Sequence, residues 1–284
     1  MKYLKVLVRS FIDFFRDSGL VLAGSISYFF MMALVPLCLF LITIFGHILG
    51  NYPGFYEFFS TRLTSFFPEI TKEITKELEK LIIFQGIGTF SLVLYGVLSF
   101  QVFSSIENAL NMIFEVKKKR TFFWSVILSL TVITFIILMI FISFIATSLI
   151  PLLKTMRHIF PDLRIGLITG FLIQYVVPFL MVFFTITVLY IFLPKMKVKL
   201  AHAFKGAFFS ALFLEVAKHI FTWYVGTVAK FGTIYGPLTA FIVFLLWVFY
   251  SSCIFLIGAE IVHNLIIFKK QSSSREGFRG IIAL

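Results

Sequence analysis

A carboxylate, an ammonium group and an imidazole occur together inside a long apolar stretch of this chain. Glu215, Lys218 and His219 are three and four residues apart, so a helix places all three on one face. Thr222 continues that face. Even on the milder insertion scales, a charge at the centre of a bilayer costs about 2.5–3.5 kcal/mol. We therefore interpret this face either as a functional pathway or as a structural ion pair that holds helices together.

A second polar group of residues follows an earlier apolar stretch. Its members lie at positions i, i+3, i+4 and i+7, on one side of a helix: Ser104, Glu107, Asn108 and Asn111. Glu260 occurs at the corresponding membrane face in the last apolar stretch. Contact of these groups with lipid is costly, so they must face protein or water. Two interpretations stay open, namely hydrogen bonds between helices and the lining of a vestibule that opens to the cytoplasm.

The residue types that catalysis needs are not clustered in the sequence. The histidines are scattered and form no metal-binding motif: His47, His158, His202, His219 and His263. No glycine-rich phosphate loop occurs either, which argues against hydrolysis of ATP by this chain alone. We expect no catalytic residue, no metal site and no cofactor, and therefore a protein that is not an enzyme.

Six apolar stretches must position the polar groups. They cover residues 20–49, 82–106, 122–150, 165–193, 203–228 and 237–262, and about 20 apolar residues suffice to cross a bilayer. The chain is 60% hydrophobic and only 13% charged, which excludes a soluble domain with a polar surface. We predict an all-α polytopic membrane protein, a bundle of six transmembrane helices in a domain spanning 19–265, followed by a cytoplasmic tail at 266–284.

Lysine and arginine residues alternate between dense and sparse segments along the chain. Dense segments lie at 2–16, 117–120, 195–205 and 269–279, and carry about twice as many cations as the segments between them. The positive-inside rule places the dense segments, and with them both termini, in the cytoplasm. The formal net charge of +12 thus reflects topology, and we expect no nucleic-acid partner.

Two further segments have amphipathic helical patterns. Residues 1–18 place Lys2, Lys5, Arg9, Asp13 and Arg16 on one side and apolar residues on the other, which predicts a helix at the membrane interface. It serves either as a plain anchor or as a direct contact for a lipid substrate. Residues 66–81 form a second such helix, expected on the outer face.

Short motifs spread over most of the chain share their order with a known family. They contain Tyr28, Pro36, Glu107, Asn108, Leu193, Pro194, Glu215, Lys218, Tyr235, Gly236, Pro237, Trp247, Tyr250 and Gly258. The sequence resembles the YihY/BrkB family of bacterial inner-membrane proteins, long labelled ribonuclease BN. The resemblance implies a multi-pass, six-helix protein of the bacterial cell inner membrane. Some members are linked to transport of envelope lipid or lipopolysaccharide, and others are named as virulence or serum-resistance factors.

Residues and resemblance together lead to a hypothesis of transport. We expect a transporter or flippase-like protein for an amphipathic, anionic envelope lipid or a related solute. Lys218 would neutralise an acidic headgroup, while Glu215 and His219 would relay or gate charge. The alternative is a non-transporting membrane scaffold that organises envelope machinery, and a small-ion channel is disfavoured because one charged helix face makes a poor pore. Membrane lipids are the expected partners, with a homo-oligomer or envelope proteins left open.

Overall fold

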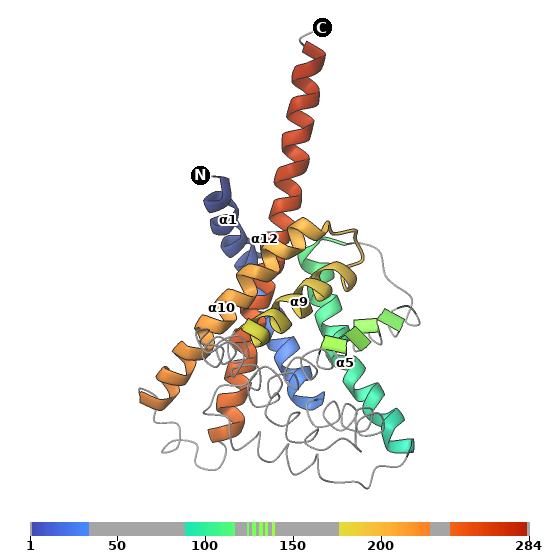
Figure 1. Cartoon of the computed structure of the whole chain (residues 1–284), viewed down its shortest axis with the longest axis vertical. Coiled ribbons are helices and arrows are strands. Elements are labelled where there is room, and N and C mark those ends of the chain that lie inside the picture. Colours follow the sequence, from blue (N-terminus) through green and yellow to red (C-terminus); the bar gives the residue numbers. More distant parts are fainter. Residues whose placement is uncertain are drawn as a thin grey trace, which may run out of the picture.

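The regular elements in the computed structural model are helices throughout the part of the chain that it describes. That part comprises residues 2–33, 89–116, 176–227 and 239–282, with separate helical positions between 124 and 139. The helices are α1 (Lys2–Arg16), α5 (Thr89–Ile113), α9 (Val177–Phe192), α10 (Leu200–Thr227) and α12 (Thr239–Ile282). A further helix covers Gly19–Ala33. Figure 1 shows α12 as the longest element, with α1 beside its upper half and α10 crossing it.

Two of the described helices are long and apolar enough to cross a membrane. They are Leu200–Val225, with a mean hydropathy of 1.3, and Phe241–Lys269, with a mean hydropathy of 2.4. Gly19–Ala33 and Val177–Phe192 are apolar but shorter. The all-helical class is thus confirmed, whereas the count of six spans stays a prediction. The motif residues Pro36, Tyr235, Gly236 and Pro237 and the amphipathic segment 66–81 lie outside the described residues.

Small residues allow α10 and α12 to cross closely. A Cβ atom on Gly206 would lie 2.7 Å from the carbonyl oxygen of Gly258. One on Gly258 would overlap the hydroxyl groups of Ser210 and Tyr190. Gly206, Ser210 and Gly258 therefore form a tight helix crossing of the kind that small residues allow in membranes. The motif glycine Gly258 has a packing role here.

Tyr190 of α9 ties a third helix to this crossing. Its hydroxyl donates to the carbonyl oxygen of Phe255 at 2.5 Å and lies 2.9 Å from the Ser210 Oγ atom. The Tyr190 ring stacks on Phe255 with a centroid distance of 5.0 Å. The side chain is completely buried. Because a buried phenol needs a hydrogen-bond partner, this arrangement fixes α9 against both α10 and α12.

A group of polar side chains contributes to the packing of α1 against α12. Asn264 Nδ2 donates to Ser10 Oγ at 3.1 Å and to Asp13 Oδ2 at 3.0 Å. Asp13 also forms ion pairs with Arg9, at 3.4 Å, and Arg16, at 3.0 Å. The amphipathic pattern had placed Asp13 on a solvated side with the cations. It is buried instead, because Asn264 and the two arginines satisfy its oxygens.

The apolar residues of α1 remain largely exposed. Leu4, Val8, Phe11, Ile12 and Phe15 each expose more than half of their surface. A tight connection then joins α1 to the helix Gly19–Ala33, with Ser18 in the left-handed region at φ 58°. A Cβ atom on Gly19 would lie 2.5 Å from the Phe14 carbonyl oxygen, so only glycine fits there. An exposed apolar surface on α1 agrees with a helix that contacts lipid.

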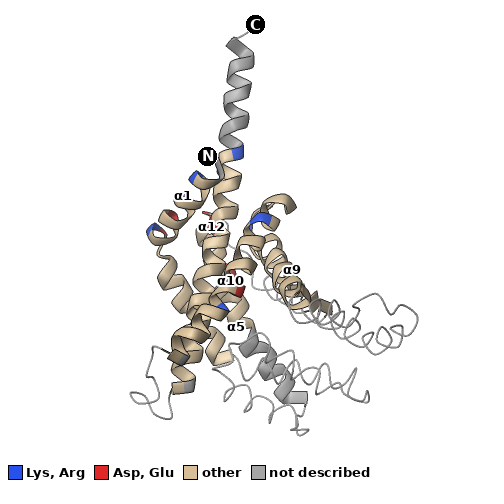
Figure 2. Cartoon of the chain, turned by 60° about the vertical axis from the view of Figure 1, so that its left-hand side comes forward, with Lys and Arg blue, Asp and Glu red and all other residues tan. Residues whose placement is uncertain are grey.

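The described cations gather at one end of the molecule. Figure 2 shows lysine and arginine mainly along α1, near the start of α10 and where α12 leaves the bundle. Figure 1 shows both ends of the chain on this same side. α12 continues as a helix to Ile282, through the segment that the sequence assigns to a tail. We call this side the cationic end; its placement in the cytoplasm stays a prediction.

Candidate functional site

The charged residues of α10 form a compact group. Lys218 Nζ lies 2.7 Å from Glu215 Oε1, and His219 Nε2 lies 3.6 Å from the same oxygen. The helical spacing of the sequence therefore brings the three side chains together. Thr222 lies on the same face, but its hydroxyl donates to the Lys218 carbonyl oxygen of its own helix at 2.9 Å. We refer to Glu215, Lys218 and His219 as the α10 triad.

The α10 triad lies inside a candidate membrane span, toward its Val225 end. Glu215 is 15 residues after Leu200 and 10 residues before Val225, the ends of that span. With a rise of 1.5 Å per residue, the two distances along the helix are about 22 Å and about 15 Å. Lys218 and His219 are seven and six residues before Val225, or about 10 Å and about 9 Å from that end.

The α10 triad is not sealed into a contact between described helices. The side chains of Glu215, Lys218 and His219 are 35%, 25% and 69% exposed. Within the described part of the chain, the ion pairs of Lys218 and His219 are with Glu215 of the same helix. Lys218 is the least exposed of the three, because helical spacing places it on nearly the same side of α10 as the buried Ala207, whereas Glu215 and His219 are turned farther from that side. The triad therefore does not join α10 to another described helix.

Aromatic packing borders the triad toward the end of α10. Phe221 and Trp247 are buried together, with ring centroids 5.4 Å apart. Val225 and Val243 complete this cluster between α10 and α12. Tyr250 lies 6.5 Å from Phe221 by ring centroids and is half exposed. The motif residues Trp247 and Tyr250 thus hold the helix that carries the triad.

The polar side of α5 binds the connection between α9 and α10. Glu107 Oε1 lies 3.4 Å from Lys195 Nζ, and both side chains are mostly buried. The Lys195 backbone N–H donates to Asn111 Oδ1 at 2.9 Å. Ser104 is half-buried and Asn108 is exposed. Sequence reasoning treated Lys195 only as a loop cation, although it is the residue that Glu107 and Asn111 share.

Ser105, next to the predicted Ser104, makes another contact between helices. Its Oγ atom lies 3.3 Å from Ser25 Oγ, in the helix Gly19–Ala33. Ser105 is buried, while Ser104 is only half-buried. The sequence pattern grouped Ser104 with Glu107, Asn108 and Asn111 on one helix face, whereas Ser105 makes the contact with the helix Gly19–Ala33.

Glu260 belongs to the contact between α1 and α12. It is 1% exposed, and the charges of Asp13, Asp17, Arg16 and Glu115 act on it. A hydrogen bond from Arg16 to Asp17, with the charge of Asp13, raises the pKa of the Arg16 guanidinium. The Glu260 Oε1 atom is buried with no hydrogen-bond partner among the described residues.

We call Ser10, Asp13, Glu260 and Asn264 the α1–α12 cluster. Sequence reasoning placed Glu260 beside the polar residues of α5 and did not identify Ser10 and Asp13 as its neighbours. The spacing of Ser10 and Asp13 on one helix, and of Glu260 and Asn264 on the other, was a usable signal. Among the described residues, no group of three His, Cys, Asp or Glu side chains could hold a metal ion.

Comparison with known proteins identifies the family. The family described as virulence factor BrkB matches residues 11–275. The chain belongs to the BrkB family. The family resemblance of the motifs is thereby confirmed, and the match includes the whole α10 triad and the polar side of α5.

Relatives of this BrkB-family chain are named as membrane proteins. A UPF0761 membrane protein of Aliivibrio fischeri is 31% identical over 257 residues, covering 88% of this chain and 79% of that protein. A UPF0761 membrane protein of Haemophilus influenzae is 29% identical over 252 residues, which cover 86% of this chain and 88% of that protein. One from Prosthecochloris aestuarii is 29% identical over 91% of this chain, which spans only 61% of that relative's length. No solved structure matches the chain. The protein is therefore a membrane protein of the BrkB family.

Proposed function

We propose that this protein moves an amphipathic, anionic envelope lipid or a related solute across the bacterial inner membrane, in the manner of a flippase. The observation that carries this proposal is the α10 triad. It places a carboxylate, an ammonium group and an imidazole inside a candidate span, partly exposed and with ion pairs that stay within one helix.

The cost of charge within a membrane supports a functional role for the triad. A buried ion pair rarely recovers the whole cost of removing its charges from water. A purely structural pair would be expected to join two helices and be covered by both. Glu215 and Lys218 instead belong to one helix, and each keeps a quarter or more of its side chain exposed. A group that binds a passing anion requires such access.

The surroundings of the triad suit an amphipathic substrate. Leu212, Val216 and Trp223 lie on the adjoining surface of α10 and are between 43% and 62% exposed. In this mechanism the headgroup passes the triad while acyl chains stay against the apolar surface. Lys218 neutralises an acidic headgroup in place of Glu215, and Glu215 and His219 relay or gate charge as the headgroup passes.

Reconstitution into liposomes tests the proposal. The wild-type chain, Lys218→Ala and Lys218→Arg would be compared for translocation of fluorescent phosphatidylglycerol. We expect Lys218→Ala to be about tenfold slower or worse, the effect of losing one charge-assisted hydrogen bond, with Lys218→Arg closer to wild type. Lys197→Ala is the matched control, because Lys197 is an exposed cation in the connection between α9 and α10. Unchanged translocation in Lys218→Ala would remove the proposed role.

The second candidate function is a membrane scaffold without transport activity. The tight crossing at Gly206, Ser210 and Gly258 and the polar docking of α1 favour a rigid body that could organise envelope proteins. A scaffold has no need to keep the triad accessible. Water-soluble thiol reagents directed at positions 215–222 therefore separate the two functions.

A further inference from the structure

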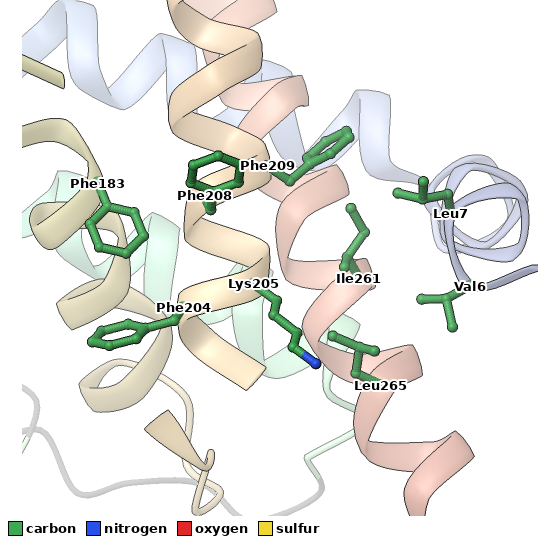
Figure 3. A pocket seen from close by; sticks show the side chains of 9 residues that line it. All are labelled: Val6, Leu7, Phe183, Phe204, Lys205, Phe208, Phe209, Ile261 and Leu265. Carbon is green, nitrogen blue, oxygen red and sulfur yellow. The ribbon is translucent and has the colours of Figure 1, made fainter. Parts of the chain in front are cut away.

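A hollow of about 490 Å³ lies between four helices at the cationic end, away from the α10 triad. Figure 3 shows α1 on one side of it and α9 on the other, with α10 and α12 between them. This volume falls within the range of about 300–1,000 Å³ that is usual for ligand sites. We call it the lateral pocket.

The walls of the lateral pocket are almost entirely apolar. Val6 and Leu7 of α1 face Ile261 and Leu265 of α12 (Figure 3). The polar α1–α12 cluster holds the two helices together one to two turns farther along α1, at Ser10 and Asp13. Of the two α1 residues that line the pocket, Val6 is buried and Leu7 stays partly exposed. The pocket therefore lies along the side of α1 that is docked on α12.

Aromatic rings form the opposite wall. Phe183 of α9 and Phe204 of α10 contact each other, with ring centroids 5.4 Å apart. Phe208 lies one turn farther along α10 and is half exposed. Such a wall offers neither donors nor acceptors to water, so an apolar chain is the ligand that it can bind.

One cation interrupts the apolar lining. Of the described residues that line the pocket, Lys205 alone carries a charge, and Figure 3 shows its side chain extending from α10 toward α12. Lys199 and Lys269 are close enough that, with Lys205, their charges act on His202. Lys205 therefore brings a positive charge to an apolar pocket, and two further lysines act on the same turn of α10. This combination matches a ligand with an apolar chain and an anionic head.

The position of α1 indicates the source of the ligand. Leu7, which lines the pocket, is 39% exposed, and Leu4, about one turn before it, is 66% exposed. In a membrane protein, apolar surface of this kind contacts acyl chains rather than water. The substance available to fill a pocket beside it is membrane lipid.

We infer that the lateral pocket binds one anionic phospholipid, with an acyl chain between α1 and the phenylalanines of α9 and α10 and the phosphate on Lys205. Lys205 and Lys218 are 13 residues apart, or about 20 Å along α10. The bound lipid therefore occupies a place separate from the triad. It joins α1 to the bundle whether or not the protein transports lipid.

Native mass spectrometry of the full chain in a nonionic detergent tests this inference. Dioleoyl-phosphatidylglycerol and dioleoyl-phosphatidylcholine would be added separately, and the retained lipids counted. We expect one phosphatidylglycerol to be retained in preference to phosphatidylcholine. Lys205→Gln should weaken phosphatidylglycerol binding about tenfold, the effect of one charge-assisted hydrogen bond, and leave phosphatidylcholine binding unchanged. Lys205→Arg should preserve the preference, and Lys197→Gln is the control for general loss of charge.

A second variant tests the apolar part of the pocket. Leu7→Trp adds a large ring at a partly exposed position, so the fold should tolerate it while the ring occupies the pocket. We expect it to reduce retention of both lipids. Equal phosphatidylglycerol retention by the wild type and Lys205→Gln would overturn the inference, as would unchanged retention in Leu7→Trp. Lys218→Ala should retain the lipid, so failure of the transport proposal can be distinguished from failure of this one.

Discussion

The α1–α12 cluster and the α10 triad contain similar polar side chains in different surroundings. In the cluster, Asp13 and Asn264 come from helices 251 residues apart in sequence, and both are buried where they meet. In the triad, Glu215 and Lys218 come from one helix and stay partly exposed. The cluster links elements, whereas the triad links nothing among the described helices. The contrast indicates how this chain builds a structural polar contact, and that the triad is not one.

The largest loss of stability is expected from a substitution in the tight crossing of α10 and α12. Gly258→Val should destabilise the protein toward the upper end of the range of about 1–3 kcal/mol for overpacking, because the new side chain overlaps Ser210 and Tyr190. Unfolding in mixed micelles with increasing SDS measures the change. Gly24→Ala is the matched control, since a Cβ atom there meets nothing within 4 Å. Equal effects of the two substitutions would show that the sealed face of α10 is placed wrongly.

Removal of Asp13 should disrupt the α1–α12 cluster. Asp13→Ala leaves the Asn264 amide buried without its carboxylate, and we expect a loss of about 1–3 kcal/mol. Hydrogen exchange should then increase along α1 before the rest of the chain. Arg9→Ala removes an exposed partner of the same carboxylate and should cost less than about 1 kcal/mol. Unaltered exchange in α1 of Asp13→Ala would contradict the role of the cluster.

Substitution of Asn111 tests whether the polar side of α5 also stabilises the fold. Asn111→Ala removes the acceptor of the Lys195 backbone N–H, which should cost about 1 kcal/mol. The same SDS titration measures it, and exchange at the connection between α9 and α10 should increase. Asn108→Ala, on the exposed side of α5, should change neither quantity. A larger loss of stability in Asn108→Ala than in Asn111→Ala would be inconsistent with the contact between Asn111 and Lys195.

The smallest effect on stability is expected at the triad itself. Lys218→Leu removes a charge from inside a candidate span and breaks only an ion pair within one helix. We expect the stability to change by no more than about 0.5 kcal/mol, the usual contribution of a partly exposed ion pair within a helix. A loss comparable to that of Asp13→Ala would make the triad a structural element and remove its contrast with the cluster.

Sequence reasoning identified the polar groups whose members share one helix. The spacing of Glu215, Lys218 and His219 was sufficient, because helical periodicity alone brings them together. It did not identify the partnership of Asp13 with Asn264 or of Glu107 with Lys195, since each depends on how two distant segments pack. The amphipathic pattern of α1 even suggested the wrong surroundings for Asp13, because a periodic pattern cannot distinguish water from a polar partner on another helix. The lateral pocket needs residues from four helices and has no signature in the sequence.

Thiol accessibility in membranes tests the central claim that the triad is open. Lys218→Cys and Ser210→Cys would be introduced singly into a chain whose native cysteines, Cys38 and Cys253, are replaced by serine. Both positions lie on α10, but Ser210 is buried in the crossing with α12. We predict that a water-soluble maleimide labels position 218 many times faster than position 210, and that phosphatidylglycerol slows the labelling. Equal and negligible labelling at both positions would show that the triad is closed to water, and would contradict the account.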